Sequence, residues 1–259
     1  GNDTSSCTGC TDPIATNYNF DANIDDGSCI YYDGNSYAID FESSQFPKDY
    51  VEVNQSNLSN LEVDDPFTIS GWIKRESTDS SNEQVLFYRG DDLDENANSF
   101  HFYVGIRTND LLHAIIIRGT GYDHIIVTDQ IPLDEWTFVT VAHSGGSDFS
   151  STQTKIYFNG IEQTYSYNAQ GAVLPFNNTT FRLGGSSDGY SSFYDGLMDE
   201  VTVFEQSLSN EEINLLMSGD LEDVQPTIHL GFNEGSGSVA YDQNFVASSI
   251  IGAPEWVGP

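Results

Sequence analysis

The chain has 259 residues, of which 40 are acidic and 8 are basic, so its formal net charge is −32 and its isoelectric point is near 4.1. At 38% hydrophobic and 13% aromatic residues, it is too apolar to be a disordered acidic tail. The only lysines are Lys48, Lys74 and Lys155. We therefore expect no nucleic acid, anionic lipid or polyanionic ligand, since these need basic patches. No run approaches the roughly 18 apolar residues that span a bilayer, so we expect no direct membrane insertion.

All three cysteines, Cys7, Cys10 and Cys29, lie within the first 29 residues. Such clustering favours a local disulfide, and we predict a bond between Cys10 and Cys29, with Cys7 left for a partner outside the chain. This bond would contribute about 3 kcal/mol. A redox or zinc pair at Cys7 and Cys10 is the alternative, although no strand–helix context surrounds it and the nearest histidine is His101. No signal peptide is visible, so we expect a mature or trimmed chain, and export is inferred from the cysteines.

Residues 1–32 are polar and lack helical periodicity, which indicates a loop-rich module. From Asn19 to Gly27, an oxygen-bearing side chain stands at every second position and a glycine closes the run. Alternate oxygen ligands in a tight loop suit a hard cation such as Ca²⁺. A turn rich in Asn and Asp that binds no metal is the alternative.

The stretch from Gly9 to Asn19, followed by Asp25 to Cys29, resembles the short cysteine-bounded repeat of Bacteroidetes surface proteins, which is akin to thrombospondin type 3 calcium repeats. Cys, Asp-Pro, Asn-Tyr-Asn and Asp-Asp-Gly-Ser-Cys occur in the same order. The resemblance implies a calcium repeat over residues 1–32, export, and a stalk or spacer role. The expected ligands are Asp12, Asn17, Asn19, Asp21, Asn23, Asp25 and Asp26.

From about residue 36, short alternating stretches separated by Gly, Asn and Asp predict strands. They lie at 67–73, 100–106, 113–118, 125–128, 137–143 and 154–158. Asn159-Gly160, placed between two apolar stretches, predicts a type I′ hairpin turn.

A single helix is expected after Ser209, which can cap it and which forms a capping box with Glu212. Leu208 and Ile213 fit a hydrophobic staple, and Gly219 ends the helix. About a dozen strands and one short helix indicate an all-β protein, a two-sheet jelly-roll sandwich rather than an α/β enzyme.

The order of these elements resembles the laminin-G-like or concanavalin-A-like jelly rolls. The resemblance is carried by residues 37–42, 49–51, 67–73, 134–141, 155–160, 181–185, 195–201, 208–209 and 211–213. It implies one jelly roll over residues 36–259. The stretch 230–237, with Tyr241 and Asp242, looks like a strand that often opens such domains. We expect it to close this sandwich in permuted order, and the alternative is the start of a further copy.

This fold class includes glycoside hydrolases, whose retaining laminarinase-like members carry E-x-D-x-x-E on one strand. Glu62 and Asp64 begin that pattern, but Phe67 stands in the closing position behind Pro66. No G-x-S-x-G sequence is present, and the five histidines fall singly on expected strands. We therefore expect no enzymatic activity.

The family resemblance also implies a calcium ion near the strand that carries Asp199 and Glu200, beside the first strand and its following turn. Glu42, in place of the usual Asp, and Asp49 match the other ligand positions.

A second candidate cation loop spans residues 91–98, where Asp92 and Asp94 begin an alternating set of oxygen ligands. Ala97 replaces the glycine that an EF-hand loop needs, so a solvated acidic loop is the alternative.

Neutral sugars are held by exposed aromatic faces with a few amides or carboxylates. We expect Trp72 and Trp136 in the core, and we place the ligand site in the loop 184–195, with the loop at 119–124 facing it. The candidate ligand-binding residues are Tyr122, Asp188, Tyr190, Phe193 and Tyr194. The alternative is that these aromatic side chains pack onto neighbouring strands.

The sequence therefore predicts an exported, calcium-stabilised, non-catalytic jelly-roll module behind a calcium repeat. We expect it to belong to an extracellular bacterial surface adhesin or polysaccharide-capture protein that binds a neutral glycan. The alternative is a structural or protein-binding adhesin domain whose partner is another surface protein. Burial of the 184–195 aromatics would favour that alternative.

Overall fold

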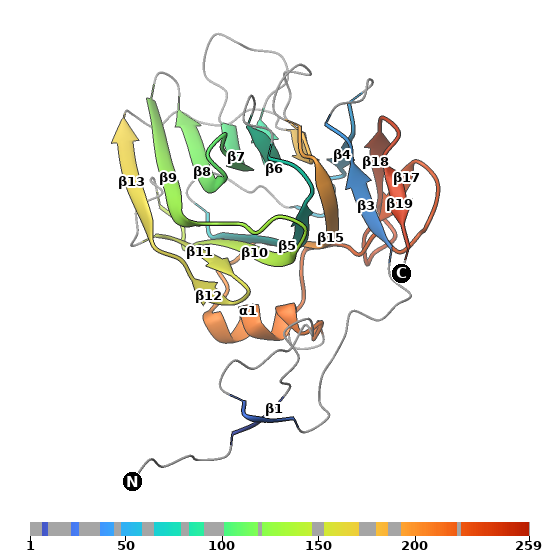
Figure 1. Ribbon diagram of the computed structural model, residues 1–259. Coiled ribbons are helices and arrows are strands. Elements are labelled where there is room, and N and C mark those ends of the chain that lie inside the picture. Colours follow the sequence, from blue (N-terminus) through green and yellow to red (C-terminus); the bar gives the residue numbers. More distant parts are fainter. Residues whose placement is uncertain are drawn as a thin grey trace.

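The computed structural model is shown in Figure 1. It describes residues 7–9, 22–25, 37–43, 48–58, 65–78, 83–90, 101–118, 121–146, 153–170, 180–185, 193–221 and 224–258. At positions 101, 103, 116–118, 121–123 and 169–170, only the backbone is described.

Two antiparallel sheets face each other and form a sandwich (Figure 1). The eight-stranded sheet runs in the order β12 (Ile161–Glu162), β11 (Thr154–Phe158), β10 (Trp136–His143), β5 (Phe67–Arg75), β15 (Gly196–Phe204), β3 (Ala38–Phe41) and β19 (Glu255–Val257), and β16 (Ile228–Leu230) also pairs with β15. The nine-stranded sheet runs in the order β13 (Tyr165–Gln170), β9 (Gly121–Gln130), β8 (Leu111–Arg118), β7 (His101–Ile106), β6 (Gln84–Gly90), β14 (Thr180–Leu183), β4 (Tyr50–Val53), β18 (Ala247–Ile251) and β17 (Val239–Tyr241).

The main hydrophobic core lies between the two sheets. Alternate residues of each strand point inward, such as Val139 and Val141 on β10 and Ile125 and Val127 on β9, and all four are fully buried. Burial of each such side chain contributes about 1.5–3 kcal/mol. The predicted all-β jelly-roll sandwich with one short helix is confirmed.

The C-terminal strands belong to both sheets. β16 pairs with β15, β18 pairs with β4, and β19 pairs with β3. Near the N-terminus, β1 (Thr8–Gly9) and β2 (Ile24–Asp25) form a short parallel pair. No helix within the described ranges is long and apolar enough to cross a membrane.

The helix α1 (Asn210–Met217), which is the one helix among the described residues, has the predicted capping box. The Ser209 hydroxyl accepts a hydrogen bond from the Glu212 backbone N–H, and the Glu212 carboxylate accepts one from the Ser209 N–H. Leu208 and Ile213 are both buried in a second hydrophobic cluster, which joins α1 to the outer face of the eight-stranded sheet. The helix is thus held by tertiary packing as well as by its cap.

The predicted hairpin turn is also present, with φ of 48° at Asn159 and 74° at Gly160.

Trp72 is partly buried against the second cluster, but Trp136 is 39% exposed, so its prediction as a core residue is wrong. Trp136 is paired with Lys74 at one end of β10, and its side chain therefore shares the outer face with that lysine.

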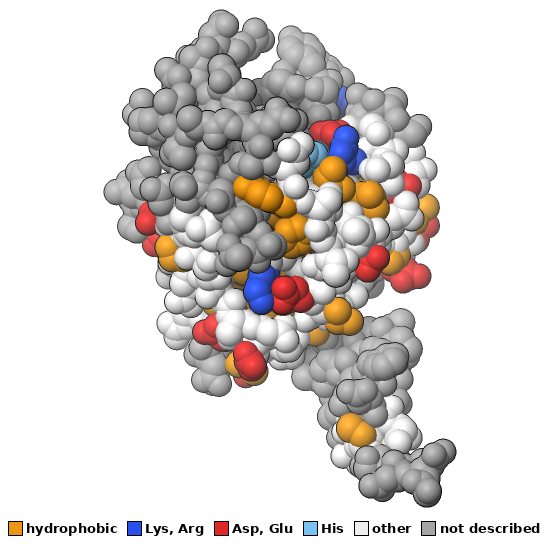
Figure 2. Space-filling view, turned by 90° about the vertical axis from the view of Figure 1, so that its left-hand side faces the viewer, with side chains coloured by type: hydrophobic (Ala, Val, Ile, Leu, Met, Phe, Trp, Pro, Cys, Tyr) orange, Lys and Arg blue, Asp and Glu red, His pale blue; other side chains and the backbone are white. Residues whose placement is uncertain are grey.

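Figure 2 shows how charged side chains lie on one face of the molecule. On the face that Figure 2 shows, the described acidic side chains are scattered among neutral ones, and basic side chains are few. This distribution fits a solvated acidic surface without a strong local field of positive sign.

Gly196 begins β15 with φ of 139°, and a Cβ there would overlap the Lys74 carbonyl oxygen on β5. We predict that Gly196→Ala lowers the free energy of unfolding by about 3 kcal/mol or more, since the clash is with backbone. Gly237 has φ of 100° and open space around it, so Gly237→Ala should cost only about 1 kcal/mol of backbone strain. Urea unfolding of both variants measures the difference, and equal losses would contradict the close approach of β15 to β5.

Candidate functional site

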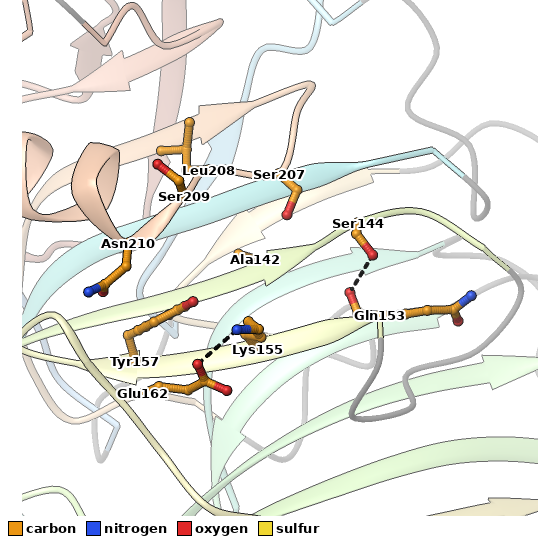
Figure 3. Close-up of a pocket in the computed structure, with 10 residues that line it drawn as sticks. All are labelled: Ala142, Ser144, Gln153, Lys155, Tyr157, Glu162, Ser207, Leu208, Ser209 and Asn210. Carbon is orange, nitrogen blue, oxygen red and sulfur yellow. Dashed lines mark hydrogen bonds and ion pairs between the residues drawn. The ribbon is translucent and has the colours of Figure 1, made fainter.

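A cavity of about 420 Å³ opens on the outer face of the eight-stranded sheet, between β10–β12 and the start of α1 (Figure 3). We call it the β11–α1 pocket. Its floor is formed by Ala142, Ser144, Gln153, Lys155, Tyr157 and Glu162, and its wall by Ser207, Leu208, Ser209 and Asn210. Its volume falls in the range of small-molecule sites in proteins.

Strand register places the floor residues side by side. Ala142 is paired with Lys155, and Tyr157 is paired with Glu162. Because cross-strand partners point to the same face of a sheet, these side chains all rise from the outer face. The Ser144 N–H donates to the Gln153 carbonyl oxygen, which continues the floor beyond the last strand pair.

Lys155 and Glu162 form an ion pair in the floor, with 2.8 Å between Nζ and Oε2. Their side chains are 51% and 50% exposed, so both charged ends remain accessible from the pocket. The hydrogen bond to Glu162 is the main cause that raises the pKa of Lys155. Burial raises the pKa of Tyr157, so its phenol stays neutral at physiological pH.

The wall is anchored to the sheet by Thr68 on β5. The Thr68 hydroxyl donates to the Gln206 carbonyl oxygen and accepts from the Leu208 N–H, at 2.9 Å in both cases. The capping box then fixes the next turn, at Ser209. The pocket therefore has a wall that is already in place before any ligand arrives.

The lining combines hydroxyls, amides and one ion pair with apolar surface from Ala142 and Leu208. These groups can both donate and accept hydrogen bonds, which suits a neutral ligand rich in hydroxyls. The sequence analysis did not find this pocket, because only the fold brings β11 and the start of α1 together. The serine hydroxyls and backbone groups near the helix cap form no recognisable motif in the sequence.

The calcium ligands expected from the family resemblance take part in other contacts. Asp49 is buried and accepts hydrogen bonds from the backbone N–H groups of Glu42, at 3.2 Å, and Ala253, at 2.7 Å. Asp199 is buried and accepts from the Glu200 N–H, and Glu200 Oε2 lies 2.5 Å from His229 Nε2. Across the residues that the structure describes, no three His, Cys, Asp or Glu side chains are arranged to hold a metal ion.

A different acidic group lies on β3 and its neighbours. Asp40 is paired with Glu255 on β19, and burial is the main cause that raises the pKa of Asp40 to about 6. The carboxylates of Glu76, Glu42, Glu255 and Asp195 raise it further, in that order. We call these five residues the β3 acidic cluster. Asp40 on β3 and Glu42, just after it, are two positions apart, and this spacing was the available sequence signal for the cluster.

Other expected site residues fall outside the described part of the chain. They are Asp12, Asn17, Asn19, Asp21, Asp26, Asp92, Asp94, Asp188 and Tyr190, together with Cys10 and Cys29 of the predicted disulfide. For Tyr122, only the backbone is described, as part of β9. Asn23 and Asp25 lie at β2, where the Asn23 N–H donates to the Cys7 carbonyl oxygen, and Cys7 has a free thiol.

The structure corrects the expectation of an aromatic sugar platform at Phe193 and Tyr194. These side chains are only 5% and 0% exposed. The Tyr194 ring contacts Phe41, with 6.2 Å between centroids, and its hydroxyl donates to the Leu197 carbonyl oxygen. Both residues therefore pack onto the sandwich and offer no face to a ligand.

The sequence suggested that each histidine lies apart from the others, but two of them are in contact. His113 and His124 lie on the adjacent strands β8 and β9, with 3.1 Å between Nδ1 of the first and Nε2 of the second. Burial, followed by His124 and Arg107, lowers the pKa of His113 to about 3, so this ring is neutral at physiological pH.

Comparison with known proteins agrees with the fold. Residues 44–214 match the family model of the concanavalin A-like lectin/glucanases superfamily, and the chain belongs to this family. No curated protein matches the chain significantly.

Two of the similar solved structures have TM-scores of 0.59 and 0.55. One is a candidate carbohydrate-binding protein from Bacteroides ovatus, with a TM-score of 0.59 and 15% identity, covering 86% of this chain and 60% of that one. The other is a heptameric SAP-like pentraxin from Limulus polyphemus, with a TM-score of 0.55 and 17% identity, covering 87% and 96%. At these identities the likeness shows the fold alone. The chain spans about 60% of the length of the Bacteroides ovatus protein.

A sialidase from Trypanosoma rangeli is also similar, with a TM-score of 0.43 and 17% identity, but the match covers 61% of this chain and only 23% of the sialidase. This likeness carries no argument about catalysis.

The raised pKa of Asp40 has a consequence for stability. The folded-state pKa of about 6 exceeds the unfolded value of 3.8, so the folded state binds the Asp40 proton more tightly. This proton binding stabilises the fold fully below pH 3.8, and the stabilisation is lost as the pH rises through 6. We predict that Asp40→Asn, with a chelator present, raises the free energy of unfolding at pH 7 by roughly 1 kcal/mol after solvent screening, with little effect at pH 4. Urea unfolding at both values tests this, with the exposed Asp129→Asn on β9 as the control. A loss of stability at pH 7 would contradict the cluster.

Proposed function

We propose that this chain is a non-catalytic carbohydrate-binding module that takes a sugar residue in the β11–α1 pocket. The observation that carries the proposal is the lining of the pocket, in which hydroxyls, amides and an ion pair lie beside the apolar surface of Ala142 and Leu208. Membership of a lectin and glucanase superfamily, and the likeness to a candidate carbohydrate-binding protein, support it.

The absence of catalysis is part of the proposal. Glycosidases act with two carboxyl groups that flank the scissile bond. Glu162 is the single acidic residue among those that line the pocket, and its carboxylate is paired with Lys155. A sugar bound there would meet hydrogen-bonding groups but no acid and nucleophile pair.

A structural or protein-binding role is the second candidate. The burial of Phe193 and Tyr194 favours it, because these aromatics would otherwise form an exposed platform. In either case we propose an extracellular setting, as part of a bacterial adhesin or polysaccharide-capture protein at the cell surface. The resemblance of residues 1–32 to a cysteine-bounded repeat of surface proteins supports that setting.

To test sugar binding, the whole chain is applied to an array of neutral and acidic glycans, and positive glycans are measured by calorimetry. Ser207→Trp should fill the pocket and weaken binding at least tenfold, whereas Ser249→Trp, on the exposed face of β18, should leave it unchanged. Binding that survives Ser207→Trp would place the site elsewhere. No binding to any glycan would refute the proposed function and favour the structural role.

Calcium is the second part of the proposal, and the β3 acidic cluster fits it. Asp40 Oδ1 is buried without a hydrogen-bond partner in the described structure, and four further carboxylates disfavour its charge. A divalent cation would relieve both effects, since Ca²⁺ takes oxygen ligands from carboxylates and carbonyls. Asp40, Glu42 and Asp195 would hold such an ion after their side chains rotate toward it.

We predict that about 5 mM Ca²⁺ raises the melting temperature of the chain, and that Asp40→Asn removes part of this shift. The part that remains would come from calcium bound elsewhere, including the expected repeat. A differential scanning fluorimetry series with Ca²⁺, Mg²⁺ and a chelator measures the effect. An identical calcium shift in the wild type and in Asp40→Asn would exclude the β3 acidic cluster as a ligand set.

A further inference from the structure

The β11–α1 pocket and the β3 acidic cluster lie toward opposite ends of the same sheet. The pocket floor is carried by β12, β11 and β10, whereas the cluster is carried by β3, its neighbour β19, and the segments around β5 and β15. Four strand steps separate β11 from β3, which is roughly 19 Å at the usual strand spacing. A cation held by the cluster cannot touch a ligand in the pocket.

The pocket has its own pair of opposite charges instead. Lys155 Nζ and Glu162 Oε2 are 2.8 Å apart, and Figure 3 shows this pair in the floor, between Tyr157 and Gln153. The ammonium group has three N–H donors, and the carboxylate has several acceptor positions, so each keeps capacity after pairing with the other. The pair thus presents a strong donor and a strong acceptor at neighbouring points.

Two hydroxyls on adjacent carbons of a sugar ring match this arrangement. Their oxygens are separated by about one hydrogen-bond length, as the Lys155 and Glu162 atoms are. One hydroxyl can donate to Glu162 while its neighbour accepts from Lys155, and both bonds are strengthened by the charges. The serine and amide groups of the wall, Ser207 and Asn210, then face the remaining hydroxyls.

The same pair disfavours an acidic sugar. A uronate or sialate carboxylate near Lys155 would also lie near Glu162, and Glu211 is close enough to affect the pKa of the Tyr157 phenol. Lys155 is the only cation among the lining residues, and the whole chain carries a net charge of −32. Repulsion from these carboxylates selects against anionic ligands.

We propose that the β11–α1 pocket binds a neutral sugar through a vicinal diol that bridges Lys155 and Glu162 directly, without a metal ion. This inference rests on the proposed function and specifies its ligand class and its independence from calcium. Lys155 and Glu162 are then the residues that determine specificity, and calcium, where bound, acts on stability only.

The experiment compares binding of a neutral glycan identified on the array in the presence of Ca²⁺ and in the presence of a chelator. Wild-type affinity should be the same in both. Lys155→Met and Glu162→Gln should each weaken binding at least tenfold in both conditions. Because the pair is half-exposed, the melting temperature of each variant should stay within about 2 °C of the wild type.

The matched control is Lys74→Met, which removes the lysine of another Lys–Glu pair, the partly exposed Lys74 and Glu76, outside the pocket. Its sugar affinity in chelator should equal that of the wild type. Glu162→Gln should also bind uronate-containing glycans better than the wild type does, because one repelling charge is gone.

The outcomes separate the two proposals. Glycan binding that disappears with the chelator, or that persists at full strength in Lys155→Met and Glu162→Gln, overturns this inference while the carbohydrate-binding function stands. A wild type that prefers uronates or sialates to neutral sugars overturns it as well. Failure of every glycan to bind, with and without Ca²⁺, overturns both proposals.

Discussion

At one end of the eight-stranded sheet, apolar side chains on the outer face need to be shielded from water, and α1 shields them. The position of the β11–α1 pocket depends on how α1 packs there. On β10, every residue after Trp136 is buried, so this strand needs packing on both faces. The main core provides the inner packing, and the second hydrophobic cluster, with Phe138 and Ile213, provides the outer. The helix α1 covers only part of this face, and the β11–α1 pocket opens beside its first residue, Asn210.

Charge is divided along the same sheet. Near β11 and β12, a lysine and a glutamate neutralise each other, whereas around β3 several carboxylates lie together and raise the pKa of Asp40. An excess of acid is tolerated at the surface because water screens it, but it becomes costly where a carboxylate is partly buried. Among the described residues, the β3 acidic cluster is therefore a local concentration of acid with a structural cost.

Local sequence patterns predicted the local structure well. The Asn159-Gly160 turn and the capping box of Ser209 and Glu212 rest on interactions between residues a few positions apart, and both are present. Strand alternation likewise predicted the sandwich, because every second side chain must reach the core. The predictions for Trp136, Phe193 and Tyr194 were wrong, because burial depends on what the rest of the chain places against a side chain.

The sequence by itself determined the class of this protein: an acidic, all-β jelly roll with one capped helix and no basic surface for polyanions. Only the tertiary structure decided where the β11–α1 pocket forms. Ser144, Lys155 and Glu162 are polar residues spread over 19 positions of the sequence. Thr68 on β5 holds the segment before α1 beside them through hydrogen bonds to Gln206 and Leu208, about 140 residues away. Strand pairing across such separations is set by the global fold, and no local pattern encodes it.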